Sequence, residues 1–569
     1  MNKPALFSQT TLVAAILLSI LTIFGCATQP AGQANHNAPR LSQAPFSKGV
    51  NLTDYFQKNS PGQIQFSPER MRKDLNDIKG LGCDVVRLPI RLHSMTNGKP
   101  DYILDPLFLE FLDQTIDIAE DAGIHIIIDN HTFDPVVETK TSIEKPLLKV
   151  WPQIARRYKN RSDLIHYEVL NEPHGISDAA WGRIQGKVIA AIRTEDTSHS
   201  IIVGPASWNS YRNLSLMPDY KDPNLIYTFH YCDPFIFTHQ GASWTDPPLT
   251  SVAAVPFPFD EERMPKIPKE LASTWIPNAF KEYRQEGTEA KVVKLLKIAA
   301  DFQKDRGVAL YCGEFGVYDV NSPDKDRTEW NRIVSKTLTE YGIAWTLWDY
   351  RDGFGIHRKG GGDVFEYDLN RPLVQSLGLT PPPTKKKPDT AETEGFTLYD
   401  DYLSIAVRER SYFPENELTY FAKEAGADGK YCIKWTEAGR YRAIRWDFSP
   451  PKNLAVLSQS GYMLQFRIKG NRPEISFDIR VLNSGAADGQ IPWRLGKTID
   501  GTIVPMDGNW QTVRIPLSEL DDKGAWKDKW FPPEGSFNLG EIYRMEIVPE
   551  SQELGDGIIW LDDIEIAAP

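Results

Sequence analysis

The chain has 569 residues, of which 41% are hydrophobic and 25% charged, a composition typical of a globular protein with more than one domain. Its formal net charge is -12 at pH 7 and its pI is near 5.5. Nucleic acids and anionic membranes require a basic surface, so both are excluded as main partners and a neutral polymer is favoured.

Residues 1–25 predict an export signal. Their apolar run, residues 12–23, is too short for a comfortable membrane span. A small residue directly before Cys26 resembles a bacterial lipoprotein signal, in which the cysteine is lipidated, and a plain secretory signal is the alternative. We therefore expect an exported protein, lipid-anchored through Cys26 at the outer membrane, the cell surface or the periplasm, or otherwise secreted. Residues 26–44, rich in Ala, Gln, Asn and Pro, predict a flexible tether.

Between residues 45 and 379, short apolar strands alternate with amphipathic stretches, as in a parallel sheet with crossover helices. Eight strands are predicted, at residues 48–52, 84–90, 124–130, 165–171, 201–204, 225–230, 308–313 and 343–348. Eight βα units close a barrel, so we predict an α/β fold, a (β/α)8 TIM barrel.

Polar and aromatic side chains lie at the carboxyl ends of these strands, where barrel enzymes carry their chemistry. They are Arg87, His131, Asn171, Glu172, His230, Glu314 and Trp348. All seven should share one rim of the barrel. Two glutamates at strand ends predict retaining glycoside hydrolysis, in which a carboxylic acid of raised pKa protonates the leaving oxygen and an ionised carboxylate about 5 Å away attacks the anomeric carbon.

Supporting roles follow from residue type. Arg87 would keep Glu314 ionised through charge-assisted hydrogen bonds, and Asn171 could hold the sugar 2-hydroxyl. His131 and His230 would position the cleft wall and the acid.

Two tryptophans are candidates for sugar stacking. Trp348 offers a flat apolar face, and Trp208 could serve a neighbouring subsite, with a place in the core as its alternative. The long, proline-rich connection at residues 231–290 is expected to wall a cleft.

The remaining cysteines, Cys83, Cys232, Cys312 and Cys432, lack the spacing of a zinc or redox site, so neither a metal nor a cofactor is expected. In an exported protein a disulfide between any two of them stays open, and Cys232 and Cys312 are the expected neighbours.

Five motifs carry a family resemblance. They are Val-Arg-Leu-Pro at 86–89, Ile-Asp-Asn-His at 128–131, Leu-Asn-Glu-Pro at 170–173, Phe-His at 229–230 and Gly-Glu-Phe-Gly at 313–316. Together they resemble glycoside hydrolase family 5 over about residues 45–377. The resemblance implies a retaining enzyme, of a family mostly endo-acting on β-1,4-glucans and β-mannans, with Glu172 as acid/base and Glu314 as nucleophile.

Two details bear on substrate and rate. Residues 235–242 resemble a segment of cellulase-type members, which favours glucan. The family usually has His-x-Tyr after the sixth strand, with the phenol hydrogen-bonded to the nucleophile, whereas His230-Tyr231-Cys232 places a thiol there. Either rate or specificity could shift, or Tyr231 could substitute with altered geometry.

The composition changes after residue 379. Residues 380–395, with a Pro and Lys run, predict a semi-rigid linker. Residues 396–569 alternate apolar and polar residues, as in an all-β sandwich. Its last strand, at 558–566, resembles that of galactose-binding-like and carbohydrate-binding sandwiches.

Aromatic residues of this second domain are candidates for sugar contacts. Trp493 and Arg494, with Trp526 and Trp530 further along, could form an aromatic and cationic platform. Alternatively, the tryptophans fill the core or face the barrel.

The sequence thus predicts a retaining endo-β-1,4-glucanase, a cellulase-like glycosidase whose partner is β-glucan or a related polysaccharide. A β-mannanase or a mixed-linkage or xyloglucan β-glucanase is the alternative among enzymes. A non-catalytic surface glycan-binding protein is the alternative of another class.

Overall fold

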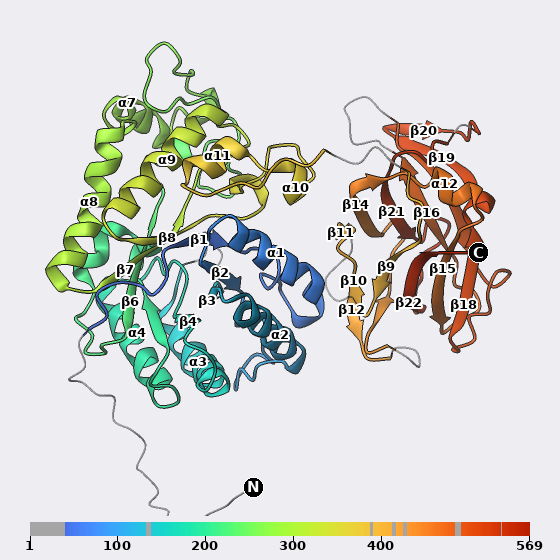
Figure 1. The fold of residues 1–569 in the computed structure, drawn as a ribbon, viewed down its shortest axis with the longest axis horizontal. Coiled ribbons are helices and arrows are strands. Elements are labelled where there is room, and N and C mark those ends of the chain that lie inside the picture. The colour runs from blue at the N-terminus through green and yellow to red at the C-terminus, as the bar shows by residue number, and fades with distance from the viewer. Residues whose placement is uncertain are drawn as a thin grey trace, which may run out of the picture.

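The computed structural model describes residues 40–132, 138–386, 391–411, 417–424, 429–483, 491–535 and 537–569. The expected export signal and the tether up to residue 39 lie outside the described residues. The chain forms two bodies, a barrel and an all-β domain (Figure 1). Within the described ranges, no helix combines the length and the apolar character needed to cross a bilayer.

The first body is a closed barrel of eight parallel strands, which confirms the predicted fold. The strands are β1 (Lys48–Asn51), β2 (Val85–Ile90), β3 (His125–Asn130), β4 (Ile165–Glu168), β5 (Ser200–Val203), β6 (Leu225–Tyr231), β7 (Ala309–Phe315) and β8 (Ala344–Leu347). They pair in sequence order, and β1 closes the barrel against β8. All eight are almost fully buried, as expected for parallel strands covered on both faces.

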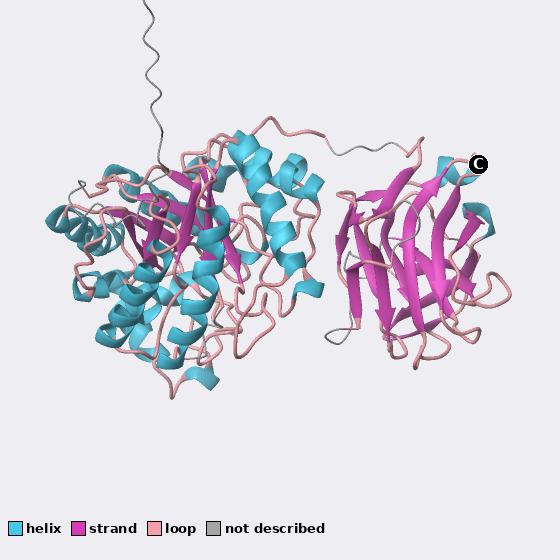
Figure 2. Cartoon of the chain, turned by 90° about the horizontal axis from the view of Figure 1, so that it is seen from below, coloured by secondary structure: helices cyan, strands magenta, loops and turns pink. Residues whose placement is uncertain are grey.

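Helices enclose the barrel (Figure 2). The α-helices are α1 (Pro68–Gly80), α2 (Pro106–Ala122), α3 (Glu144–Tyr158), α4 (Asp178–Arg193), α5 (Ala206–Asn209), α6 (Phe235–Thr238), α7 (Ile276–Glu286), α8 (Glu289–Arg306), α9 (Asp324–Glu340), α10 (Phe365–Asp368) and α11 (Arg371–Ser376). The 3-10 helices of this body are η1 (Pro61–Gln63), η2 (Thr141–Ile143), η3 (Tyr211–Leu216), η4 (Lys269–Leu271) and η5 (Asp352–Phe354).

Local sequence signals fix the ends of the long helices. At the start of α2, the Asp105 side chain accepts hydrogen bonds from the backbone N–H groups of Leu107 and Phe108, and Pro106 occupies the first helical position. Gly123 ends the helix at φ 60, a left-handed conformation that glycine adopts without penalty.

The second body is a sandwich of two sheets with one short helix, α12 (Ala455–Gln459), and one 3-10 turn, η6 (Leu517–Glu519), in the described residues. One sheet contains β10 (Tyr402–Leu403), β9 (Phe396–Asp400), β22 (Ile558–Ala567), β13 (Cys432–Thr436) and β12 (Leu418–Ala422), with β15 (Met463–Gly470) and β18 (Gln511–Pro516) joined through β22. The other has the order β11 (Val407–Glu409), β14 (Ile444–Lys452), β21 (Ile542–Val548), β16 (Phe477–Asn483), β17 (Trp493–Ile499), β19 (Asp521–Lys527) and β20 (Lys529–Phe531).

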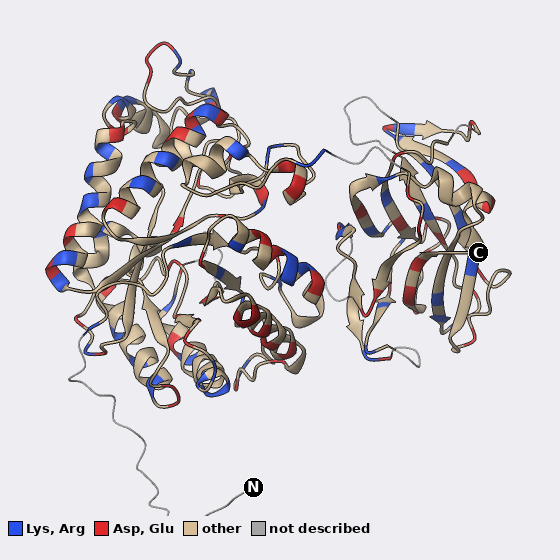
Figure 3. Cartoon of the chain, in the orientation of Figure 1, with Lys and Arg blue, Asp and Glu red and all other residues tan. Residues whose placement is uncertain are grey.

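Alternating burial builds the core between these sheets. Every second residue of β15 is buried, and Trp435 and Trp446 fill the interior. The predicted all-β sandwich is therefore confirmed. Acidic and basic positions alternate along much of both bodies, whereas α2 carries acidic positions alone (Figure 3).

Candidate active site

The structure brings the seven predicted rim residues together. Arg87 lies in β2, His230 in β6 and Glu314 in β7, and the others follow β3, β4 and β8 directly. The Arg87 Nη1 atom is 2.7 Å from Glu314 Oε1, and its Nη2 atom is 2.8 Å from Asn171 Oδ1. His230 Nδ1 is 2.7 Å from Glu172 Oε1. The carboxyl ends of the strands thus form one connected polar site, as the parallel barrel requires.

The backbone aims Glu172 into this site. Its φ is 44, a left-handed conformation that few residues other than glycine adopt and that often marks a functional position. The backbone carbonyl of Glu172 accepts a hydrogen bond of 2.7 Å from the Nδ1 atom of His174, which holds the turn. Burial raises the pKa of Glu172 to about 6. A carboxyl with this pKa keeps its proton more readily than an ordinary glutamate, as a general acid must.

Glu314 lies opposite Glu172, with His230 between them. His230 Nδ1 is 3.7 Å from Glu314 Oε2, and one ligand atom from each of the three residues lies within 4.8 Å of the others. Burial raises the pKa of Glu314, and the neighbouring Arg87 guanidinium opposes this rise. Atoms this close could also share a cation, so the trio is the place where a metal ion could be held.

A glycine after Glu314 permits the close approach of β7 and the end of β8. A Cβ atom on Gly316 would lie 2.3 Å from the backbone oxygen of Trp348. The Gly-Glu-Phe-Gly motif therefore carries a packing requirement beside its carboxylate.

Arg87 is the centre of a buried network that is larger than the sequence indicated. Its guanidinium binds both oxygens of Glu168 (2.8 and 2.9 Å), Asn51 Oδ1 (2.9 Å) and Asp129 Oδ2 (3.0 Å), in addition to Glu314. Burial opposes the charge of Arg87, but the surrounding carboxylates raise its pKa well above its usual value.

Sequence reasoning missed the acidic members of this network. Asp129 lies near the end of β3 (His-Ile-Ile-Ile-Asp-Asn) and Glu168 ends β4 (Ile-His-Tyr-Glu), so a carboxylate near the carboxyl end of a strand is the signal that they share with Glu172 and Glu314. Burial raises the pKa of Asp129 to about 7 and also raises that of Glu168.

Two histidines in the site are neutral. Burial lowers the pKa of both His131 and His230 to about 4. His131 Nδ1 is 2.8 Å from Asp129 Oδ2, which places the ring proton on Nδ1 and leaves Nε2 to accept from Asn171 Nδ2 at 3.3 Å. The buried Asn209, also missed from the sequence, lies 3.4 Å from His230 Nε2.

Aromatic faces line the rim. Trp348 stacks on His131 with ring centroids 5.4 Å apart. Trp208 stacks on His174 at 4.7 Å and is 49% exposed, so it does not belong to the core.

The long connection after β6 adds aromatic residues that the sequence analysis did not name. Trp244 and Trp275 are each 38% exposed. Trp244 contacts Tyr318 and Phe354, with ring centroids 4.8 and 6.1 Å away. These exposed rings are the kind of surface on which sugars stack.

All four cysteines in the described residues are free thiols, so the disulfide that the sequence left open, between Cys232 and Cys312 or any other two of them, does not form. Burial raises the pKa of both thiols well above the usual value, and the neighbouring Glu172 and Glu314 add to the effect at Cys232. Thiols of this kind are poor nucleophiles at neutral pH.

Tyr231 does not take the place of the missing tyrosine. Its ring stacks on Trp330 of α9 with centroids 5.9 Å apart and also contacts Tyr211. The side chain therefore points into the layer between barrel and helices, because successive residues of a strand face opposite sides.

In the second domain, Trp526 and Trp530 are paired across the β19–β20 hairpin and are 61% and 48% exposed. Trp493 contacts Phe531 on the same hairpin. Arg494 is buried, donates to the backbone carbonyl of Gly524 at 3.2 Å, and lies 5.1 Å from the Trp530 ring. It supports this aromatic surface from below.

Comparison with known proteins agrees with this arrangement. The family model described as Cellulase (glycosyl hydrolase family 5) matches residues 45–353, more than half of the chain, and that of Carbohydrate binding domain 30 matches residues 422–568.

Individual relatives share only modest sequence identity with this chain. Endoglucanase 3 of Fibrobacter succinogenes is 27% identical over 340 residues, which cover 55% of this chain and 51% of that protein. Endoglucanase C of Acetivibrio thermocellus is 27% identical over 327 residues, covering 54% of this chain and 91% of that protein. A hyperthermophilic endo-β-1,4-glucanase solved in complex with substrate has 24% identity and a TM-score of 0.49, covering 58% of this chain and 97% of that one.

The chain thus spans about half the length of Endoglucanase 3. The matched family segment contains the whole polar rim from Asn51 to Trp348. The chain belongs to glycosyl hydrolase family 5 and carries a family 30 carbohydrate-binding domain at its C-terminal end.

Proposed function

We propose that this protein is a retaining, endo-acting glycoside hydrolase that cleaves β-1,4-linked glucan. One observation carries the proposal: a carboxylate oxygen of Glu172 lies within 4.8 Å of one of Glu314. Retaining enzymes hold their two carboxyl groups about 5–5.5 Å apart, whereas inverting enzymes separate them by roughly 6.5–9.5 Å to admit a water.

In the first step, Glu314 attacks the anomeric carbon while Glu172 gives its proton to the departing oxygen. The glycosidic bond breaks and a glycosyl ester forms on Glu314. In the second step, Glu172 takes a proton from water, which attacks the anomeric carbon and releases Glu314. The pKa of about 6 at Glu172 supports this double use, since the group can hold and release a proton near neutral pH.

Neighbouring residues support these steps. Arg87 favours the ionised form of Glu314 at 2.7 Å, although burial raises the pKa of that carboxyl. Neutral His230 donates to Glu172 and fixes its orientation. Asn171, held by Arg87, could bind the sugar 2-hydroxyl, a contact that strengthens in the transition state.

Glucan as substrate is supported by the endoglucanase relatives and by residues 235–242. The test is reducing-sugar release from carboxymethyl cellulose, barley β-glucan, xyloglucan and galactomannan, with Glu314→Ala as control. Release from galactomannan alone would identify a β-mannanase. Release from barley β-glucan or xyloglucan alone would identify the mixed-linkage or xyloglucan enzyme. No release from any polymer by folded protein would favour a glycan-binding protein without turnover.

We also propose that the exposed pair Trp526 and Trp530 is a glucan contact of the carbohydrate-binding domain, without Trp493, which pairs with Ala525 and so faces the other side of the sheet. Their exposure and cross-strand pairing support a flat stacking surface. The buried Arg494 would act by holding Trp530 rather than by touching sugar.

Export with a lipid anchor at Cys26 is a further proposal, supported by the sequence features of residues 1–26. Incorporation of labelled palmitate into the wild-type chain and its loss in Cys26→Ala would test it.

A further inference from the structure

An aromatic cluster joins the all-β domain to the barrel. Phe66, before α1, and Phe111 of α2 stack with ring centroids 4.8 Å apart. Tyr402, Phe421 and Tyr431 contact them from the other domain, with Phe421 at 4.6 Å and Tyr431 at 6.1 Å from Phe111. Phe111 and Tyr431 are fully buried and Phe421 is 5% exposed. Separation of the domains would expose this aromatic surface to water, which opposes separation.

Hydrogen bonds surround the cluster. Arg70 of α1 donates to the backbone carbonyls of Ser404 (3.1 Å) and Val407 (2.5 Å). Gln65 donates to Glu409 at 2.6 Å. Because the partners of Arg70 are backbone atoms of one short segment, the contact fixes the orientation of that segment as well as its distance.

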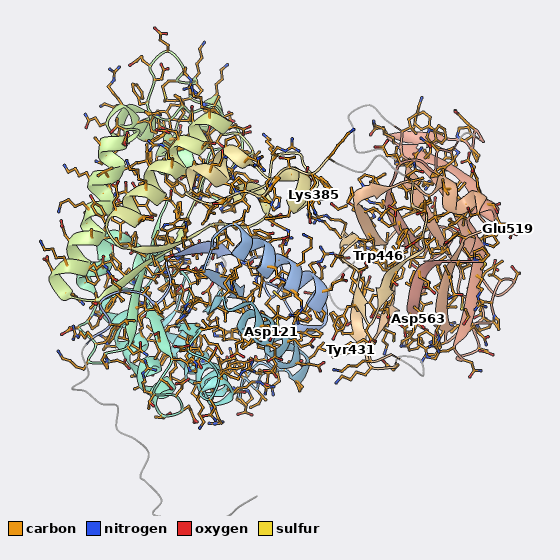
Figure 4. All side chains as sticks on the ribbon, in the orientation of Figure 1. Asp121, Lys385, Tyr431, Trp446, Glu519 and Asp563 are labelled. Atoms are coloured by element: carbon orange, nitrogen blue, oxygen red, sulfur yellow. The ribbon has the colours of Figure 1, made fainter. Side chains whose placement is uncertain are left out.

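A second set of bonds lies on α2. Glu110 accepts a hydrogen bond of 2.6 Å from the Tyr431 hydroxyl and pairs with Lys430. Figure 4 labels Tyr431 at the edge of the all-β domain that faces the barrel, well away from the linker residue Lys385. Non-covalent contacts away from the linker therefore also join the two domains.

The all-β domain also binds the loop that follows β8, residues 348–364. Arg408 of β11 donates to the carboxylate (2.7 Å) and to the backbone carbonyl (2.6 Å) of Asp363. The Ser449 hydroxyl donates to the Gly362 carbonyl at 2.8 Å. The end of this loop is thus tied to the second domain.

The start of the same loop is tied to the barrel. Asp349 accepts a hydrogen bond of 2.9 Å from Thr53, and Arg351 binds both oxygens of Asp74 in α1 at 2.5 and 2.6 Å. Further along, the buried Arg327 of α9 donates to the backbone carbonyls of Phe354 and Gly355 at 2.8 and 2.6 Å, so the loop is bound to the barrel as far as Gly355.

The loop after β8 also carries aromatic parts of the candidate cleft. It begins at Trp348, which stacks on His131. Further along, Phe354 contacts Tyr318 and Trp244, with ring centroids 5.2 and 6.1 Å away. A shift of the loop would move the aromatic wall of the cleft.

We propose that the carbohydrate-binding domain is a docked part of the catalytic unit and not a freely tethered module, and that it positions the substrate-binding wall of the barrel through the contacts of Arg408 and Ser449 with the loop after β8. Arg408 is in this sense a positioning residue for sugar binding. The docking itself does not depend on the proposed function, whereas the effect on substrate binding rests on it.

Docking is tested by cleaving the linker in the full chain. A specific protease site is inserted after Lys386, the protein is cut, and the fragments are passed over a size-exclusion column at micromolar concentration. We expect both fragments to elute together at the position of the uncut protein. Fragments that elute separately would overturn the proposal. Because elution needs no activity, this result is independent of whether the protein hydrolyses glucan.

The positioning role is tested in the uncut chain with carboxymethyl cellulose. Arg408→Ala should raise KM roughly 2- to 10-fold, the loss expected for a weakened sugar–aromatic contact, with kcat nearly unchanged. Arg408→Lys keeps a donor for Asp363 and should restore most of the affinity. Arg544→Ala removes a comparable, partly exposed ion pair, with Asp447 across the β14–β21 ladder, and should leave KM unchanged. An unchanged KM in Arg408→Ala, or an equal rise in Arg544→Ala, would contradict a positioning role.

Discussion

Replacing Glu172 by glutamine should stabilise the fold at neutral pH while it removes the proposed acid/base group. In the folded protein, burial raises the pKa of this carboxyl from its ordinary 4.5 to about 6. In the unfolded chain the ordinary value returns, so the folded state binds the proton more tightly. The contribution of Glu172 to stability is therefore fully present below about pH 4 and is lost as the pH rises through about 6.

The magnitude follows from the two pKa values. The step from 4.5 to about 6 corresponds to about 2 kcal/mol, at about 1.4 kcal/mol for each tenfold change in proton affinity. Glutamine cannot ionise, so Glu172→Gln avoids this loss. The amide oxygen of glutamine can still accept the hydrogen bond from His230, so the substitution does not lose this contact. We expect a gain of about 2 kcal/mol at pH 7.5, or about 3 °C in Tm, and almost none at pH 4.

The assay is thermal unfolding of wild type and variant at pH 4 and pH 7.5. Glu195→Gln is the control of opposite sign, since Arg156 lowers the pKa of that exposed carboxyl and the substitution should give no gain at either pH. If Glu172→Gln shows the same stability difference from wild type at both pH values, or is less stable than wild type at pH 7.5, the inference that burial disfavours the ionised carboxylate is refuted.

Four further outcomes are expected. Glu314→Ala should lower kcat by at least about a thousandfold while KM and Tm change little, measured by reducing-sugar release. Arg87→Lys should destabilise the barrel by about 3 kcal/mol and move the acidic limb of the kcat/KM profile to higher pH, because one ammonium cannot replace contacts to five residues. Cys232 should react slowly with iodoacetamide below pH 8, since its thiol pKa is raised, and rapid alkylation would contradict this. The double variant Trp526→Ala and Trp530→Ala should reduce retention on insoluble cellulose roughly tenfold without changing kcat on a soluble glucan, and unchanged retention would remove this surface from binding.

The barrel could be predicted from sequence because the strands are short, largely apolar runs, and several of them end at a polar residue. Parallel strands then place residues as distant as Arg87 and Glu314 on one rim, and the structure joins them at 2.7 Å. The sandwich followed from alternation of apolar and polar residues, as in β15. Both are properties of local periodicity, which a single sequence contains.

The buried acids around Arg87 could not be predicted in the same way. Asp129 and Glu168 lie within strands, and periodicity alone does not tell whether such a residue faces the barrel interior or the helices. The left-handed backbone at Glu172 depends on tertiary contacts as well. Nor could the docking of the domains be foreseen, because Phe111 and Phe421 have the pattern of core residues and the sequence does not say which core they join.

The distribution of protons in the site decides which carboxylate can be the nucleophile. Four carboxyl groups, Asp129, Glu168, Glu172 and Glu314, lie near the Arg87 guanidinium, and four negative charges there would repel one another strongly. Burial raises the pKa of Glu172 to about 6 and that of Asp129 to about 7, so these two are the groups that take up protons near neutral pH. Burial also raises the pKa of Glu168 and of Glu314, and the Arg87 guanidinium, 2.8 and 2.7 Å away, opposes both rises. In the proposed mechanism, a proton held by Glu172 prepares this residue as the acid and also removes one negative charge near Glu314, which favours the ionised form needed for attack.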